Sequence, residues 1–160
     1  MIRFSPANHS YVSVSPDTVN WIGVTSLVSY YEHEFDPDVS AVKCSKNRKS
    51  KWFGMTPERI KQAWRNESKR SLDAGTWFHN KTEQSILSSP VFESDSGSLD
   101  VIKPVIIAGE KYATSQILEN GKIYPEHLIY LHSDGICGQT DRVEVINNKV
   151  FVRDYKTAKT

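Results

Sequence analysis

Residues 136–156 have the sequence ICGQTDRVEVINNKVFVRDYK, and this stretch carries the clearest structural pattern in the chain. Two runs rich in β-branched residues, 136–146 and 149–155, flank the dipeptide Asn147-Asn148. Such a dipeptide between two strand-like runs predicts an antiparallel hairpin with a two-residue turn. Because side chains alternate between the two faces of a strand, this turn also predicts which residues share a face.

One face of the predicted hairpin brings two carboxylates together. The turn places Asp141 directly opposite Asp154, at a separation of roughly 4.5–5.5 Å, where like charges repel. A divalent cation between them would remove the repulsion. The rest of this face consists of valines, at positions 143, 145, 150 and 152. We expect the opposite face to lie in solvent, because it carries the charged residues Arg142, Glu144 and Arg153. An ordinary surface hairpin would account for either aspartate alone, but poorly for both on the valine face.

The strand that we expect over 123–131 adds a third carboxylate, Glu126, to this face. Its position depends on the loop that joins it to the hairpin. A two-residue loop at Asp134-Gly135 and a four-residue loop over 132–135 both place Glu126 on the face of Asp141, whereas an odd-numbered loop would move it off.

Hard oxygen ligands with a nearby ammonium group suit Mg²⁺ or Mn²⁺. Such an ion binds phosphoryl oxygens and lowers the pKa of a bound water. Lys156 projects from the same face as Asp154, where it could position the attacking water or offset negative charge. These groups together predict metal-assisted hydrolysis of a phosphodiester.

The formal net charge of +1 hides an uneven distribution, although it excludes a strongly basic, histone-like protein. Residues 43–70 contain ten Lys or Arg and two acidic residues. Aromatic residues are interleaved there, as in segments that bind nucleic-acid phosphates and bases. The candidate nucleic-acid-binding residues are Lys46, Arg48, Lys49 and Lys51. The alternative is a solvated helical face, and for Trp52 and Trp64 we favour packing against the core.

Composition limits the remaining classes of protein. The chain has 160 residues, 38% of them hydrophobic, which predicts one globular domain. Its two cysteines, Cys44 and Cys137, are too few and too far apart for a zinc ribbon or an iron–sulfur cluster, so we expect free thiols. With no long apolar run and no signal-peptide pattern, we expect no membrane association and a cytoplasmic protein (the host cytoplasm if viral), with an organelle matrix left open.

The rest of the chain predicts helices before the strands, and therefore a mixed α/β fold. Thr56-Pro57-Glu58 is a strong helix start, with a hydroxyl cap followed by proline. The other expected elements are a strand over 9–14 with a turn at Pro16-Asp17, a helix from Thr25 or Ser26 to Tyr31, a helix over 71–87, an exposed loop over 88–100 and a helix over 109–119.

Several of these residues resemble the PD-(D/E)XK nuclease superfamily. Asp154-Tyr155-Lys156, with Asp141 upstream in Gly138-Gln139-Thr140-Asp141, is similar to its signature. Gly75, Thr76 and His79 match the helix-borne Gly-Thr-x-x-His motif of the RecB-like exonuclease branch, and Pro125-Glu126 matches its upstream acidic position. Gly23-Val24-Thr25-Ser26-Leu27 and Trp64 also resemble the N-terminal part of this branch. The resemblance covers about residues 20–160.

The resemblance implies a restriction-endonuclease-like fold, with a mixed central sheet flanked by helices. It implies that Asp141 and Asp154 bind Mg²⁺ or Mn²⁺, that Lys156 assists the nucleophile, and that His79 is a further ligand or orients the metal water; Glu126 joins this catalytic set. The whole chain, 1–160, would be one nuclease domain. Its helical and basic region would cover about 20–88 and its catalytic strands about 122–157.

The branch usually continues after this signature into further sheet and a helix with a Gln-x-x-x-Tyr motif, whereas this sequence ends four residues after Lys156. We therefore expect the C-terminal part of the fold to be missing, or a partner protein to complete it. The expected function is a deoxyribonuclease, an exonuclease that acts on single-stranded DNA or DNA ends in replication, repair or recombination. The alternatives are a non-catalytic nucleic-acid-binding fragment of a truncated or split nuclease, and a partner-binding domain whose acids hold Ca²⁺.

Overall fold

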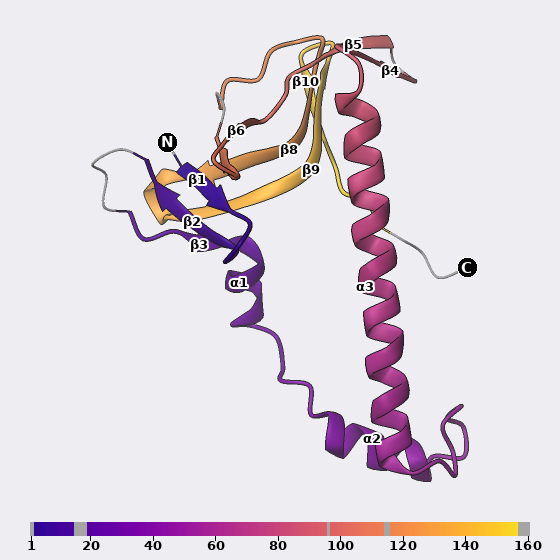
Figure 1. The fold of residues 1–160 in the computed structure, drawn as a ribbon. Helices are drawn as coiled ribbons and strands as arrows, with labels where there is room; N and C mark the ends of the chain where they lie inside the picture. The colour runs from indigo at the N-terminus through magenta and orange to yellow at the C-terminus, as the bar shows by residue number, and fades with distance from the viewer. Residues whose placement is uncertain (1, 15–18, 96, 114–115, 157–160) are drawn as a thin grey trace.

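The structure, a computed structural model, describes residues 2–14, 19–95, 97–113 and 116–156 (Figure 1). Within these residues, helices flank two β-sheets, one of which contains both parallel and antiparallel pairs. This confirms the mixed α/β class. The turn expected at Pro16-Asp17 lies outside the described residues.

The predicted hairpin forms with the predicted register. Strands β9 (Ile136–Ile146) and β10 (Lys149–Arg153) pair antiparallel from Ile146 and Lys149 onward. Asn147 and Asn148 both adopt positive φ, 51° and 58°, as a twist-matched two-residue turn requires. Strand β8 (Lys122–Leu131) pairs with β9 from Leu131 and Ile136, so its loop has four residues. Of the two even loops that were open, the longer one occurs.

Strands β8, β9 and β10 form a meander at one end of the larger sheet, whose order is β10-β9-β8-β5-β4. β5 (Gly97–Val101) runs parallel to β8, β4 (Val91–Ser94) pairs with β5, and β3 (Ile22–Gly23) runs parallel to β9. The smaller sheet has the order β2-β1-β7-β6, with β1 at Ile2–Ser5, β2 at Ser10–Ser13, β6 at Val105–Ile107 and β7 at Glu110–Tyr112.

The helices are α1 (Val24–Ser29), α2 (Pro37–Lys46) and α3 (Pro57–Leu87). α3 begins as predicted, since the Thr56 hydroxyl accepts from the amide of Arg59 at 3.4 Å. It then continues through the position where a second helix was expected to begin, because residues 58–74 contain neither glycine nor proline to end it. Its 31 residues span about 46 Å.

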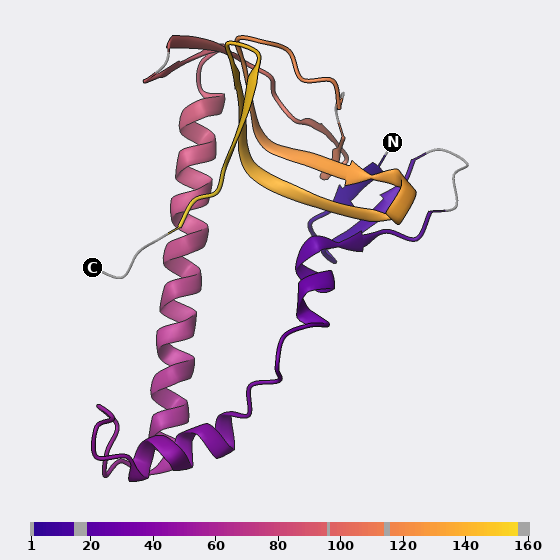
Figure 2. The ribbon, with the colours of Figure 1, turned by 180° about the vertical axis from the view of Figure 1, so that it is seen from behind.

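Only the C-terminal part of α3 is anchored in the sheets (Figures 1 and 2). There Ile86 packs with Leu99 of β5 and Ile123 of β8 in one buried cluster. A second cluster joins the smaller sheet to the far half of the β8–β9 hairpin, through residues such as Phe4 and Leu128. The N-terminal part of α3 extends away from both sheets and ends beside α2.

Three elements differ from expectation. Residues 88–100 are not an exposed loop but contain the β4–β5 hairpin, because Phe92 and Leu99 pair across it and Leu99 is buried. The described residues within 109–119 contain no helix; β7 pairs there with β6 around a turn in which Ala108 and Gly109 have positive φ. α2 was not predicted, although Asp36 caps it through two amides and Pro37 occupies its first turn.

The faces of the hairpin are also only partly as predicted. Val143 and Val145 are buried, but Val150 and Val152 are exposed because β10 is at the edge of the sheet. Glu144 was expected in solvent and is instead 1% exposed, held by Arg142 at 3.0 Å and Arg153 at 3.2 Å. The hairpin face that carries Glu144 is covered because α3 and the β4–β5 hairpin pack against it.

Both cysteines are free thiols, as expected: Cys137 is buried and Cys44 is partly exposed. Among the described residues, no helix has the length and apolar character needed to cross a bilayer.

Candidate metal and active site

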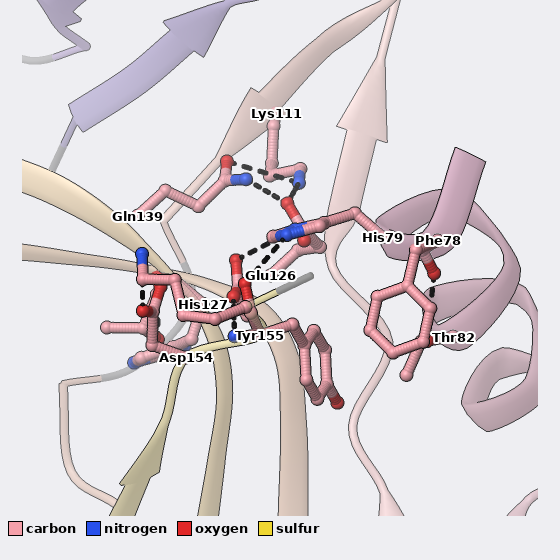
Figure 3. A network of polar contacts seen from close by, with 12 residues as sticks. Phe78, His79, Thr82, Lys111, Glu126, His127, Gln139, Asp154 and Tyr155 are labelled. Carbon is pink, nitrogen blue, oxygen red and sulfur yellow. Dashed lines mark hydrogen bonds and ion pairs between the residues drawn. The ribbon is translucent and has the colours of Figure 1, made fainter. Parts of the chain in front are cut away.

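Three elements bring His79, Glu126 and Asp141 together. Figure 3 shows His79 and Glu126 pointing toward each other. His79 comes from α3, Glu126 from β8 and Asp141 from β9, and one ligand atom from each lies within 4.8 Å of the others. We call these three residues the cluster. All are partly buried, and they line a cleft of about 680 Å³ between α3 and the turn that follows β1.

The hydrogen bonds of His79 determine which of its nitrogens is available. Its Nε2 lies 3.1 Å from the backbone carbonyl of Tyr155, which can only accept, so Nε2 carries the proton. Nδ1 then faces a carboxylate oxygen of Asp141 at 3.3 Å. Two acceptors at this distance repel unless a proton or a metal ion lies with them. A histidine that donates one N–H to a carbonyl and leaves the other nitrogen bare is the usual arrangement in metal sites.

Glu126 occupies an unusual backbone position. Its φ is 51°, in the left-handed region, and it follows Pro125, which has no N–H for the strand ladder. Paired residues flank this position on both sides, Pro125 with Arg142 and His127 with Thr140. Left-handed non-glycine residues cost of order 1–3 kcal/mol and tend to occur at functional sites. Here the left-handed residue is Glu126, whose carboxylate lies beside His79 and Asp141.

The Glu126 carboxylate has two further neighbours. Lys111 of β7 lies 3.3 Å from Oε2, and Gln139 of β9 donates to the same oxygen. Lys111 also donates to Gln139 Oε1 at 3.2 Å, which closes the triangle seen in Figure 3. Burial nevertheless raises the pKa of Glu126, with Glu83 and Asp141 adding to the rise and Lys111 opposing it.

Asp141 is held by the chain that follows β10. The sequence placed it opposite Asp154, but the paired residues of β9 and β10 end one step earlier, at Arg142 and Arg153. The amide of Tyr155 instead donates to Asp141 Oδ2 at 2.5 Å. The Tyr155 backbone therefore contacts both Asp141 and His79, through its N–H and its carbonyl.

Asp154 and Lys156 lie at the rim of the site rather than within the cluster. Their side chains are 61% and 83% exposed, and they pair with each other at 2.7 Å. The hydrogen bond from Lys156 lowers the pKa of Asp154, and slight burial opposes this shift. Asp154 in turn raises the pKa of Lys156. Of the five predicted catalytic residues, the structure unites three and leaves this pair outside them.

The predicted nucleic-acid-binding residues are far from the cluster. They lie at the end of α2 and in the loop that leads to α3, and all four side chains, Lys46, Arg48, Lys49 and Lys51, are exposed. Trp52 and Trp64 pack edge to face at 6.5 Å and are partly buried, but neither belongs to the core clusters of the described residues, so the packing against the core favoured for them is not found. Figure 1 shows this loop at the end of α3 that is remote from the sheets.

Sequence reasoning missed Lys111, Gln139 and the backbone of Tyr155. The signal for Gln139 was present, since it lies two residues before Asp141 and shares its strand face. Lys111 lay in a segment that was expected to be helical, so its strand neighbours were not foreseen.

The donor set of the cluster suits a divalent cation. One imidazole nitrogen and two carboxylates, partly buried and in a cleft, can supply up to half of an octahedral shell and leave room for water and substrate oxygens. Carboxylates favour Mg²⁺ and Mn²⁺, whereas imidazole favours later metals, so the set alone does not select one ion.

The chain matches no protein-family model, no curated protein and no solved structure.

Proposed function

We propose that this protein is a metal-dependent deoxyribonuclease in which His79, Glu126 and Asp141 hold Mg²⁺ or Mn²⁺. One observation carries the proposal: Nε2 of His79 contacts a carbonyl, while its Nδ1 faces the Asp141 carboxylate at 3.3 Å with Glu126 beside them. The proposed substrate is DNA, as single strands or ends, with exonuclease action in replication, repair or recombination. The basic segment supports a polyanionic substrate.

The residues of the chain have separate roles in this proposal. When bound, a divalent ion supplies charge to a phosphoryl oxygen and acidifies a water. Tyr155 orients His79 and Asp141 through its backbone. Glu126 shares in holding the ion, and Lys111 and Gln139 keep its carboxylate in place. Lys156, at the rim beside Asp154, meets the substrate phosphate once it enters the cleft.

A second function has support from a different observation. Asp154 and Lys156 are exposed and paired with each other, which also fits a protein that binds nucleic acid without cleaving it. In that case the missing catalytic geometry would come from a further segment or from a partner protein. The two functions predict the same binding and opposite results for cleavage.

The test uses end-labelled single-stranded and duplex DNA with Mn²⁺, Mg²⁺ or Ca²⁺, and EDTA as the blank. We expect Mn²⁺- or Mg²⁺-dependent cleavage that falls at least about a hundredfold in Glu126→Gln and Asp141→Asn. Asp134→Asn is the matched control, because Asp134 lies in the loop at the other end of the same β8–β9 hairpin. Cleavage that survives both cluster substitutions contradicts the proposed site. Tight binding without cleavage under every metal favours the second function.

A further inference from the structure

The side of α3 that carries His79 continues beyond the cleft as an exposed, basic surface. Helical residues recur every 3.6 positions, so Arg65, 14 residues before His79, lies within about 40° of its direction. Lys69, 10 residues before His79, lies within about 80°. Both side chains are exposed. We call this pair the α3 track.

The cleft and the track are continuous. The α3 residues that line the cleft begin at Ser71 and Leu72, within one helical turn of Lys69, and run to the cluster. Farther along the helix the same direction is buried, because Ile86 packs into the sheet core. Figures 1 and 2 show that the half of α3 nearer to α2 extends away from both sheets.

Between Lys61 and His79, the charged residues within about 90° of the His79 direction are all positive, although Asp73 follows Lys69 by one turn. Outside this stretch, Glu58 and the cleft residue Glu83 also point to within about 60° of His79. The two acids between Arg65 and His79 are Glu67 and Asp73, and both point about 120° away from His79. Arg65 donates to the neutral Gln62 at 2.8 Å rather than to a carboxylate. By contrast, Lys61, which also points toward the cleft side, pairs with Asp38 of α2. The track thus presents positive charge along the approach to a cluster of negative charge.

We propose that Arg65 and Lys69 bind the phosphates of a DNA strand that lies along α3 and enters the cleft at Ser71. This rests on the proposed function for the identity of the polyanion. At 1.5 Å per residue, Arg65 lies about 21 Å from His79 along the helix axis. A stacked strand advances 3.4 Å per nucleotide, so the track and the cluster together hold about six nucleotides. The substrate is therefore an oligonucleotide strand and not a mononucleotide or dinucleotide.

The same helix provides a matched control. Arg59 and Arg70 are also exposed cations, but they point about 160° and 180° away from His79. The pair Arg59→Gln/Arg70→Gln removes the same charge from the same helix as Arg65→Gln/Lys69→Gln. A general loss of positive charge would weaken binding in both pairs, whereas a track would weaken it in one.

The experiment measures the anisotropy of fluorescein-labelled oligothymidylates of about 4, 8 and 16 nucleotides in EDTA, so that no cleavage occurs. For the unsubstituted chain we expect clearly tighter binding of the 8-mer than of the 4-mer. Arg65→Gln/Lys69→Gln should weaken the 8-mer about tenfold and reduce the slope of log K against log salt by about 1.4, which corresponds to two phosphate contacts. The control pair should stay within about twofold.

Equal losses in the two pairs, or a 4-mer that binds as tightly as the 8-mer, would overturn the track. Far-UV circular dichroism and a thermal melt confirm that each variant is folded. The result is independent of catalysis. Length-dependent binding through Arg65 and Lys69 without metal-dependent cleavage would refute the nuclease and support the track. Cleavage without this length dependence would support the nuclease and refute the track.

Discussion

At the scale of single residues, the site depends on how three side chains are held rather than on which residues are present. His79 is a useful ligand because the Tyr155 carbonyl accepts a hydrogen bond from its Nε2 and so orients the ring. Asp141 is oriented because the Tyr155 amide donates to it. Glu126 points to the same place from a left-handed backbone position. A short contiguous motif therefore organises residues that lie 14 and 76 positions upstream of it.

The raised pKa of Glu126 predicts a pH dependence of metal binding. A metal ion competes with the proton on this carboxyl, so Mn²⁺ affinity should fall as pH is lowered toward a value above the ordinary glutamate pKa of about 4.3. Isothermal titration of Mn²⁺ between about pH 5 and 8 measures this loss. Glu126→Gln should bind Mn²⁺ more weakly and with a flatter pH profile. An unchanged profile in this variant would assign the titration to another group.

Lys111 predicts an effect of the opposite sign. Its side chain is 12% exposed, and its ammonium group lies 3.3 Å from Glu126 and so repels any divalent ion bound by that carboxylate. We expect Lys111→Gln to tighten Mn²⁺ binding several-fold in the same titration, because neutral glutamine removes the repulsion. Lys149→Gln, at the exposed β9–β10 turn, is the control. Weaker binding in Lys111→Gln would show that the lysine chiefly positions Glu126.

At the scale of elements, the β9–β10 hairpin carries one repeated residue type in two environments. Val143 of β9 is 2% exposed, whereas Val152, its partner on β10, is 63% exposed. The difference arises because residues such as Ile102 and Leu118 cover β9 but not the edge strand. The alternation of side chains along the strands predicted that the valines share a face. How deeply each valine is buried depends on the whole sheet.

This pair of valines gives a direct test of the packing. Val143→Ala should lower the free energy of unfolding by about 2 kcal/mol, because it removes two buried methyl groups. Val152→Ala should change it by less than about 0.5 kcal/mol. Urea denaturation followed by tryptophan fluorescence measures both. Similar losses at the two positions would mean that the outer face of β10 is covered in solution.

At the scale of the whole molecule, α3 separates two charged regions. The cluster lies where α3 meets the sheets, and the basic loop between α2 and α3 lies beyond the first residue of that helix. His79 is 22 residues from Pro57, or about 33 Å along the axis. The modest net charge of +1 is thus the sum of regions held apart by a rigid helix.

This separation predicts a second length threshold for DNA binding. About ten nucleotides of stacked strand are needed to span the cluster and the basic loop. Neutralising Lys46, Arg48, Lys49 and Lys51 with glutamine should weaken a 16-mer strongly and an 8-mer little, in the same anisotropy assay. An equal loss of affinity for the 8-mer and the 16-mer would contradict this prediction. It would mean that the loop lies beside the cleft, or that its charge acts on DNA binding only in a general way.

Much of this architecture was predictable from local sequence. The Asn147-Asn148 turn determined the β9–β10 register, and Thr56-Pro57 determined where α3 begins. Local signals misled where tertiary pairing decided the outcome, as in the β6–β7 hairpin, where Gly109 serves a turn and not a helix start. The β4–β5 hairpin was missed because serine and acidic residues outnumber the few apolar residues that pack it.

The sequence by itself determined the meander of β8, β9 and β10, the helix that carries His79 and the chemistry of the candidate ligands, because turns, caps and alternation act between near neighbours. Only the tertiary structure decided that Glu126, Asp141 and His79 meet, that Asp154 and Lys156 lie at the rim, and that Lys111 enters the site. Those outcomes depend on the left-handed turn at Glu126, the end of β10 at Arg153 and the packing of α3 on the sheet. Each of these features depends on contacts between residues far apart in the chain, and the free energy of such contacts cannot be read from any short segment.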